Sequence, residues 1–251
     1  MGCNDDSTQN TDADRQLLET IWNRIHGKEI CISDKELVDS IHEMPVCDHT
    51  MEFVSALLFY HGIGVEKSLE DARRCMIQSA DYGFLDAQFA LAEAYDKGLF
   101  GKKDIFRAAK YYRKVADQGD VCASLCYAEA CLKIYEETKI QFFAEEALDE
   151  LWDKAYYCDD ANLMLARCFM LGTAGEVSFD IAKQQIDYLE SMGHDVEDLR
   201  RQYAELKSEY CRKKIEPGMS KQDSLDAFFG VGLESSVIRQ RNLESYFGTL
   251  E

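Results

Sequence analysis

The sequence predicts an all-α protein built as a helix–loop–helix repeat solenoid, and three observations lead to this prediction. The 251 residues include only two prolines, as expected of a largely helical chain, because proline breaks the helical hydrogen-bond ladder. Apolar and small residues recur at helical spacing through most of the chain. A pattern of alanine and glycine also returns every 35 to 39 residues, which is typical of an array of similar units.

The repeat is defined by an alanine followed, eleven positions later, by a glycine or cysteine. The four pairs are Ala72 and Gly83, Ala108 and Gly119, Ala147 and Cys158, and Ala182 and Gly193. A column of alanines keeps the same step: Ala56, Ala92, Ala128 and Ala166. Alanines at fixed positions let helices approach closely, so each unit presents a face that only its neighbour can bury.

The second unit illustrates the predicted structure. Residues 87–97 carry small and apolar side chains at helical spacing, and Gly98 is expected to end this helix in the left-handed conformation. After a loop of residues 99–103, Asp104 is expected to cap a second helix that runs to about Gln118. Ser68 and Ser178 occupy the equivalent capping positions, and Ser68 with Asp71 resembles a capping box.

The segment ALLFYHGIGVEKSLEDARRCMIQSADYGFLDAQFALAEAYDKGLF resembles the Sel1-like repeat, a relative of the tetratricopeptide repeat. The positions that carry the resemblance are Gly62, Gly64, Val65, Ala72, Ala80 and Gly83. It extends over residues 49–193, although the third unit has Ile134 and Cys158 in place of both glycines. The resemblance implies a solenoid that binds an unknown protein partner as a scaffold or adaptor.

The flanking segments complete the predicted domain organisation. Residues 1–14 are interpreted as a disordered leader and residues 15–48 as two helices that cap the array. Residues 194–216 are expected to form a terminal capping helix, closed by Pro217 and Gly218, and residues 217–251 form a tail outside the repeat. An open solenoid needs such caps because its end units otherwise expose an apolar face.

Composition excludes several classes of function. The net charge of −19 opposes direct binding of nucleic acid through a basic surface. The sequence has no P-loop, G-x-S-x-G or H-E-x-x-H motif, so we expect no enzymatic activity and no cofactor. The only close Cys/His pair is Cys47 and His49, and two ligands do not complete a zinc site, so we expect no metal.

The chain lacks an apolar signal segment and any apolar run long enough to span a membrane. We therefore expect an intracellular protein, cytoplasmic or nuclear, whose ten cysteines are reduced and mostly serve as small buried hydrophobes, such as Cys122 and Cys126. The start Met1-Gly2-Cys3 is similar to doubly acylated proteins, but Asp6 stands where such proteins have Ser or Thr.

The tail carries a second, shorter repeat, Q-x-x-L-x-x-aromatic-aromatic-G, at residues 222–230 and 240–248. The leucine and the two aromatics lie three and four positions apart, so one helical turn places them on one side as an apolar plug. This pattern resembles the PIP box, the peptide by which proteins dock on the sliding clamp PCNA. The resemblance implies a partner-binding role for Gln222, Leu225, Phe228, Phe229, Gln240, Leu243, Tyr246 and Phe247.

Two interpretations of the whole chain therefore remain open. In the first, the protein is an adaptor that holds one partner on its array and docks on PCNA in DNA replication or repair. In the second, it is a general scaffold whose tail aromatics pack as a structural cap and bind no clamp.

Overall fold

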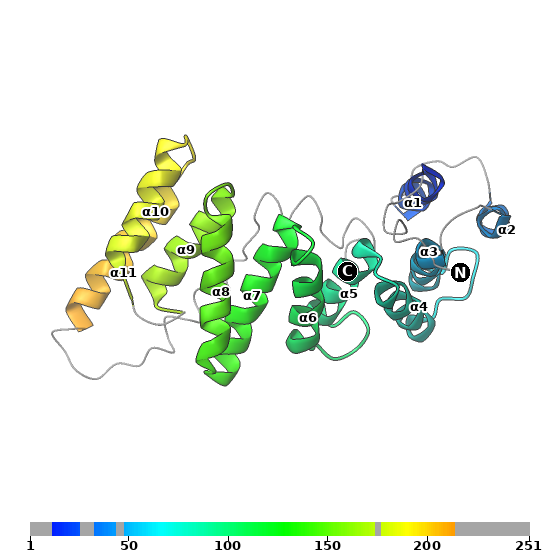
Figure 1. The fold of residues 1–251 in the computed structure, drawn as a ribbon, viewed down its shortest axis with the longest axis horizontal. Helices are drawn as coiled ribbons and strands as arrows, with labels where there is room; N and C mark the ends of the chain where they lie inside the picture. The colour runs from blue at the N-terminus through cyan, green and yellow to red at the C-terminus, as the bar shows by residue number, and fades with distance from the viewer. Residues whose placement is uncertain (1–11, 26–32, 44–47, 174–176, 214–251) are drawn as a thin grey trace, which may run out of the picture. The chain divides into compact units, whose positions relative to one another are not determined.

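The computed structural model describes residues 12–25, 33–43, 48–173 and 177–213, which contain eleven α-helices and no strand (Figure 1). These residues divide into two compact units at the end of α6, between Val115 and Ala116. The bounds in the first unit are α1 Asp12–Ile25, α2 Asp34–Glu43, α3 Asp48–His61, α4 Leu69–Asp81, α5 Leu85–Lys97 and α6 Ile105–Ala116. Those in the second are α7 Val121–Thr138, α8 Gln141–Lys154, α9 Asp159–Leu171, α10 Phe179–Ser191 and α11 Glu197–Lys213.

In the first unit, α3 packs on α4, α4 packs on α5, and α1 contacts α3. Helices α5 and α6 meet through aromatic pairs: the Phe89 and Tyr112 rings lie 5.6 Å apart edge to face, and Tyr95 stacks on Tyr111 at 6.1 Å. The alanines of the repeat are buried at these contacts, with Ala72 and Ala108 fully excluded from solvent. The predicted helix–loop–helix units are thereby confirmed as packed pairs.

In the second unit, each helix from α7 to α10 packs on the next, and α11 contacts both α9 and α10. The core around Ala166, Ala182 and Ile186 is covered by Val196 and Leu199, at the start of α11. These two side chains are buried, whereas most of α11 is polar and exposed. Helix α11 thus covers the apolar face of the α9–α10 pair with its first residues.

One hydrogen bond recurs in three of the four repeats and fixes the entry to the second helix. The backbone N–H of the N-cap residue donates to the carbonyl nine positions earlier: Ser68 to Phe59 at 3.0 Å, Asp104 to Tyr95 at 2.9 Å, and Ser178 to Phe169 at 2.9 Å. The side chains of the same N-cap residues each accept a hydrogen bond from the backbone N–H of the third helical residue, as predicted.

The Ser68–Asp71 pair does not form the reciprocal capping box that the sequence suggested. The Ser68 N–H is already bonded to the Phe59 carbonyl, so the Asp71 carboxylate instead accepts a bond from the Ser68 hydroxyl at 2.7 Å. Asp71 also lies 2.8 Å from Arg74. The Asp71 carboxylate therefore accepts a hydrogen bond from the hydroxyl of the N-cap residue and not from its backbone N–H.

The third repeat departs from the others where its glycine is missing. Helix α5 ends at Gly98 and α9 at Gly172, both left-handed, but α7 continues through the fully buried Ile134 to Thr138. Lys139 then takes the left-handed conformation with φ of 58°. Without a glycine at position 134, the helix adds a turn before an ordinary residue ends it.

Helix boundaries differ from the predicted ones by a few residues at several ends. Helix α1 begins at Asp12, inside the segment interpreted as a leader, α5 begins at Leu85, and α6 ends at Ala116. Within the described part of the chain, no helix is long and apolar enough to cross a membrane. The described cysteines are free thiols, six of them buried and only Cys211 exposed, as the packing role requires.

Candidate protein-binding groove

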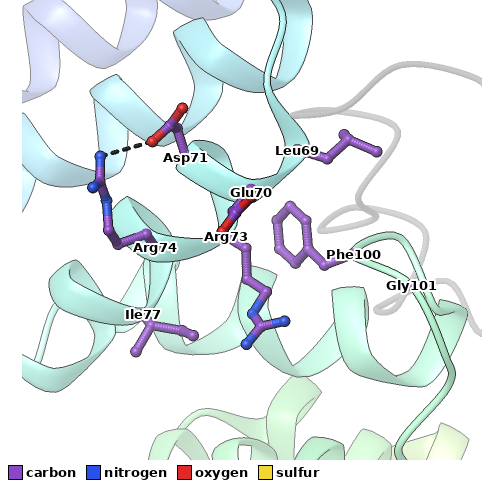
Figure 2. Close-up of a pocket in the computed structure, with 8 residues that line it drawn as sticks. All are labelled: Leu69, Glu70, Asp71, Arg73, Arg74, Ile77, Phe100 and Gly101. Atoms are coloured by element: carbon purple, nitrogen blue, oxygen red, sulfur yellow. Dashed lines mark hydrogen bonds and ion pairs between the residues drawn. The ribbon is translucent and has the colours of Figure 1, made fainter.

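A groove of about 580 Å³ lies on the first unit, between the first half of α4 and the loop that joins α5 to α6 (Figure 2). The two segments meet because α5 packs antiparallel to α4, which brings the end of α5 beside the start of α4. Leu69, Arg73 and Ile77 are spaced four apart and form one stripe of α4 along the groove. Phe100 and Gly101 supply the opposite side from the loop.

Leu69 and Phe100 form the apolar surface at the centre of the groove, and the partly buried Ile77 lies farther along α4. Leu69, the first residue of α4, leaves 46% of its surface exposed. The Phe100 ring is half-buried and rests edge to face against Tyr60 at 6.2 Å. Burial raises the pKa of Tyr60, so this ring stays neutral beneath the groove. The groove therefore offers an apolar surface that the protein supports from below.

Backbone constraints hold the loop that carries Phe100. Gly98 ends α5 at φ of 76°, and a Cβ at this position would lie 2.9 Å from the carbonyl oxygen of Gly101. The N–H of Leu99 donates to the Ala94 carbonyl at 2.9 Å, and that of Gly101 donates to the Gly98 carbonyl at 3.1 Å. A loop tied in this way presents Phe100 in a fixed place, which reduces the ordering cost of binding.

A second hollow of about 230 Å³ continues the groove toward α6, and it is rich in basic side chains. Arg73 and Phe100 line both hollows, and Lys102, Lys103 and Arg107 line only the second. Five of the residues that line the two hollows are cationic, namely Arg73, Arg74, Lys102, Lys103 and Arg107, against the three acidic residues Glu70, Asp71 and Asp104. A local excess of positive charge in a chain of net charge −19 marks this surface as distinct.

Two of these cations are already paired, and the others are not. Arg74 lies 2.8 Å from Asp71 and points away from Phe100. Arg107 lies 3.2 Å from Asp104 and 5.4 Å from the centre of the Tyr95 ring. Arg73, Lys102 and Lys103 are exposed and form no ion pair with any residue that the structure describes. These three charges remain available to a ligand.

Two of the carboxylates that line the groove are held in place by neighbouring groups. Asp71 is held by Arg74 and the Ser68 hydroxyl, and Asp104 is held by Arg107 and its own helix N-terminus. No group of three or more potential metal ligands occurs among the described side chains.

The binding residues expected from the sequence all lie outside the described residues, in the segment 214–251. The structure therefore does not place Gln222, Leu225, Phe228, Phe229, Gln240, Leu243, Tyr246 or Phe247. The groove, in turn, was not predicted from the sequence. The sequence signals that could have indicated it are two basic doublets, Arg73-Arg74 on the second helix of the first repeat and Lys102-Lys103 in the loop of the second repeat.

The Sel1 repeat family matches residues 51–83 and 85–120. These ranges coincide with α3–α4 and α5–α6, the pairs that build the groove. The first and second repeats are therefore similar to Sel1 repeats in sequence. No curated protein matches the chain.

Solved structures that are similar to this chain include two repeat proteins. A Sel1 repeat protein from Oxalobacter formigenes has 21% sequence identity and a TM-score of 0.51, over 71% of this chain and 70% of its own. A protective antigen of uropathogenic Escherichia coli strains, which displays an SLR fold, has 15% identity and a TM-score of 0.33, over 93% of this chain and 61% of its own. The first likeness extends the repeat fold beyond the two matched repeats, and the chain is an all-α repeat solenoid.

Proposed function

We propose that this chain is a non-enzymatic adaptor whose repeat array holds a protein partner in the groove between α4 and the α5–α6 loop. The observation that carries the proposal is the groove itself, where a supported aromatic ring lies beside exposed, unpaired cations. Helical repeat proteins use extended surfaces of this kind to bind other proteins. Aromatic and arginine side chains are also the residues that contribute most to protein–protein affinity.

Site-specific crosslinking tests this proposal. A photoreactive amino acid replaces Leu69 at the edge of the groove or, as a control, Lys183 on the exposed surface of α10. Irradiation in cells of the source organism is expected to give a discrete protein adduct from position 69 and none of the same mass from position 183. Identical adduct patterns from both positions, or none from position 69, would contradict a partner in the groove.

We further propose that the tail docks on PCNA, which makes the protein an adaptor for DNA replication or repair. The proposal is supported by the two copies of Q-x-x-L-x-x-aromatic-aromatic, eighteen residues apart. In each copy, the plug is formed by a leucine and two aromatics, and the glutamine is the polar anchor. The plugs are Leu225, Phe228 and Phe229 in the first copy and Leu243, Tyr246 and Phe247 in the second, and the anchors are Gln222 and Gln240.

Calorimetry of the full chain with PCNA from the source organism tests the tail. We expect micromolar or tighter binding, the loss of one site in Phe228→Ala/Phe229→Ala, and the loss of the other in Tyr246→Ala/Phe247→Ala. Each loss should exceed about 2 kcal/mol, as expected when a buried aromatic anchor is truncated. A wild-type chain that does not bind PCNA would favour the alternative, in which the tail aromatics pack as a structural cap of the scaffold.

A further inference from the structure

We propose that the groove binds a short acidic peptide segment of the partner that carries one large apolar side chain among its carboxylates. The inference rests on the proposed adaptor function and names the chemistry of the segment that the array recognises. Its basis is the placement of an apolar surface, Leu69 and Phe100, directly beside three unpaired cations, Arg73, Lys102 and Lys103.

The charge of the groove selects for carboxylates. Arg73 lies in both hollows, and Lys102 and Lys103 follow Phe100 in the chain, so positive charge adjoins the apolar surface on two sides. Two of the three acidic side chains nearby are already engaged, because Asp71 binds Arg74 and Asp104 binds Arg107. The third, Glu70, is exposed and is outnumbered by the three cations. A basic or neutral peptide would leave the three cations without partners, whereas carboxylates would complement them.

The apolar surface selects for a bulky side chain at the centre of the segment. Leu69 is nearly half exposed, and the Phe100 ring is backed by Tyr60. An aromatic or long aliphatic side chain placed between them would remove apolar area from water, which carboxylates alone cannot do. Charge at the edge with an apolar contact at the centre is the usual arrangement of a protein interface.

The dimensions of the charged region favour a short peptide over a nucleic acid. The three unpaired cations of the groove lie within two small hollows, and the chain as a whole carries a net charge of −19. A nucleic acid needs a basic surface that follows its phosphates over many nucleotides. A short acidic peptide can place its carboxylates on the three cations and end before it meets the acidic remainder of the surface.

Fluorescence anisotropy with the full-length protein tests the inference. The probe is a labelled peptide Asp-Glu-Asp-Phe-Asp-Glu-Asp, and it is compared with Asn-Gln-Asn-Phe-Asn-Gln-Asn and with Asp-Glu-Asp-Ser-Asp-Glu-Asp. We expect the first to bind with a Kd below about 1 mM, and the other two to bind at least about tenfold more weakly. Binding of the acidic probe should weaken as salt rises, since its charges are exposed.

Two double variants locate the site on the protein. Arg73→Glu/Lys102→Glu should reduce affinity for the acidic probe by at least about tenfold, because attraction becomes repulsion. Lys35→Glu/Lys183→Glu changes the net charge equally at two exposed positions outside the groove and should leave affinity nearly unchanged. Leu69→Ser, a change at an exposed position, should weaken binding of the acidic peptide that contains phenylalanine and leave binding of the acidic peptide that contains serine nearly unchanged. Circular dichroism confirms that each variant is folded.

The acidic-peptide inference would be overturned by equal affinity for the acidic and the amide peptides, or by equal losses of affinity in the two double variants. It would also be overturned if a short oligothymidylate bound more tightly at the groove than the acidic peptide does. These failures are distinguishable from failure of the adaptor function. A partner crosslinked at position 69 through a basic or neutral segment would keep the adaptor and remove the inference. The absence of any adduct at position 69 would remove the adaptor function itself.

Discussion

At the scale of single residues, one position of the repeat has opposite roles in the first two units. Gly64 and Phe100 occupy corresponding places in the loops that follow α3 and α5. A Cβ on Gly64 would lie 2.6 Å from Cγ2 of Val38 and 2.7 Å from the carbonyl oxygen of Asp34, so α2 rests directly on the first loop. The second loop instead carries Phe100, whose ring lines an open groove.

The contact between Gly64 and α2 leads to a prediction about stability. Gly64→Ala should destabilise the protein in two ways, through the positive φ of 66° and through the clash with Asp34 and Val38. Gly83→Ala is the matched control, because Gly83 also has a positive φ, 92°, but no atom within 4 Å of its Cβ position. In urea unfolding, the control should lose about 1 kcal/mol, and Gly64→Ala about 1 kcal/mol more, from the clash. Equal losses would show that α2 does not constrain the loop.

The cysteines allow a second prediction at this scale. Burial raises the pKa of the Cys168 thiol to about 11, and its side chain is 2% exposed, whereas Cys211 is exposed on α11. Only the thiolate reacts with alkylating agents, and a raised pKa keeps Cys168 protonated through neutral and mildly alkaline pH. Iodoacetamide at pH 8 should therefore label Cys211 in the native protein and Cys168 only after unfolding, as read by mass spectrometry. Labelling of both at similar rates in the native protein would contradict the described burial.

At the scale of helices, glycine and cap residues explain which elements could be predicted from sequence. As predicted, one helix ends at Gly98, and two others begin after Asp104 and Ser178. These positions could be predicted because each residue acts through local backbone geometry that a short segment specifies. The extension of α7 to Thr138 was not predicted. Ile134 is fully buried, and this tertiary contact keeps the helix intact where the other repeats have a glycine.

Buried amides join successive helix pairs in a way that the sequence pattern did not indicate. The Gln88 side-chain amide donates to the Ala80 carbonyl at 2.9 Å, and that of Asn162 donates to the Ala155 carbonyl at 2.7 Å. In both cases a side chain at the start of one repeat satisfies a carbonyl at the end of the preceding helix. Carbonyls at helix ends need such partners when they are buried.

Asn162→Ala should therefore cost about 1–3 kcal/mol, because it leaves the Ala155 carbonyl buried without this donor. Gln184→Ala is a suitable control, since Gln184 is exposed on α10 and a surface change of this kind stays within about 0.5 kcal/mol. Urea unfolding of both variants measures the difference. A cost for Asn162→Ala as small as that of the control would mean that water replaces the amide.

At the scale of the whole molecule, the repeat fold follows from a period in the sequence, but the groove does not. The alanine–glycine pattern predicts helix pairs because the same small residues return at each contact between helices. The groove joins Leu69 and Arg73 on α4 to Phe100 and Lys102 beyond α5, and no motif links these positions. Only the packing of α4 on α5 brings them together, so their proximity could not be predicted from local patterns.

The repeat architecture makes a final prediction about how stability is distributed. In a repeat solenoid, each helix pair is stabilised mainly by its neighbours. A destabilising substitution in the core should therefore increase local unfolding mostly in its own and adjacent helices. Leu165 on α9 is fully buried, and Leu165→Ala should cost about 2–5 kcal/mol. Hydrogen exchange followed by mass spectrometry should then show lost protection in α9 and α10, with α3 and α4 nearly unchanged. Leu57→Ala, at a buried position of α3, should give the reverse pattern. If either variant reduced protection equally in both units, the chain would unfold as one cooperative body, and the additive description of its repeats would be wrong.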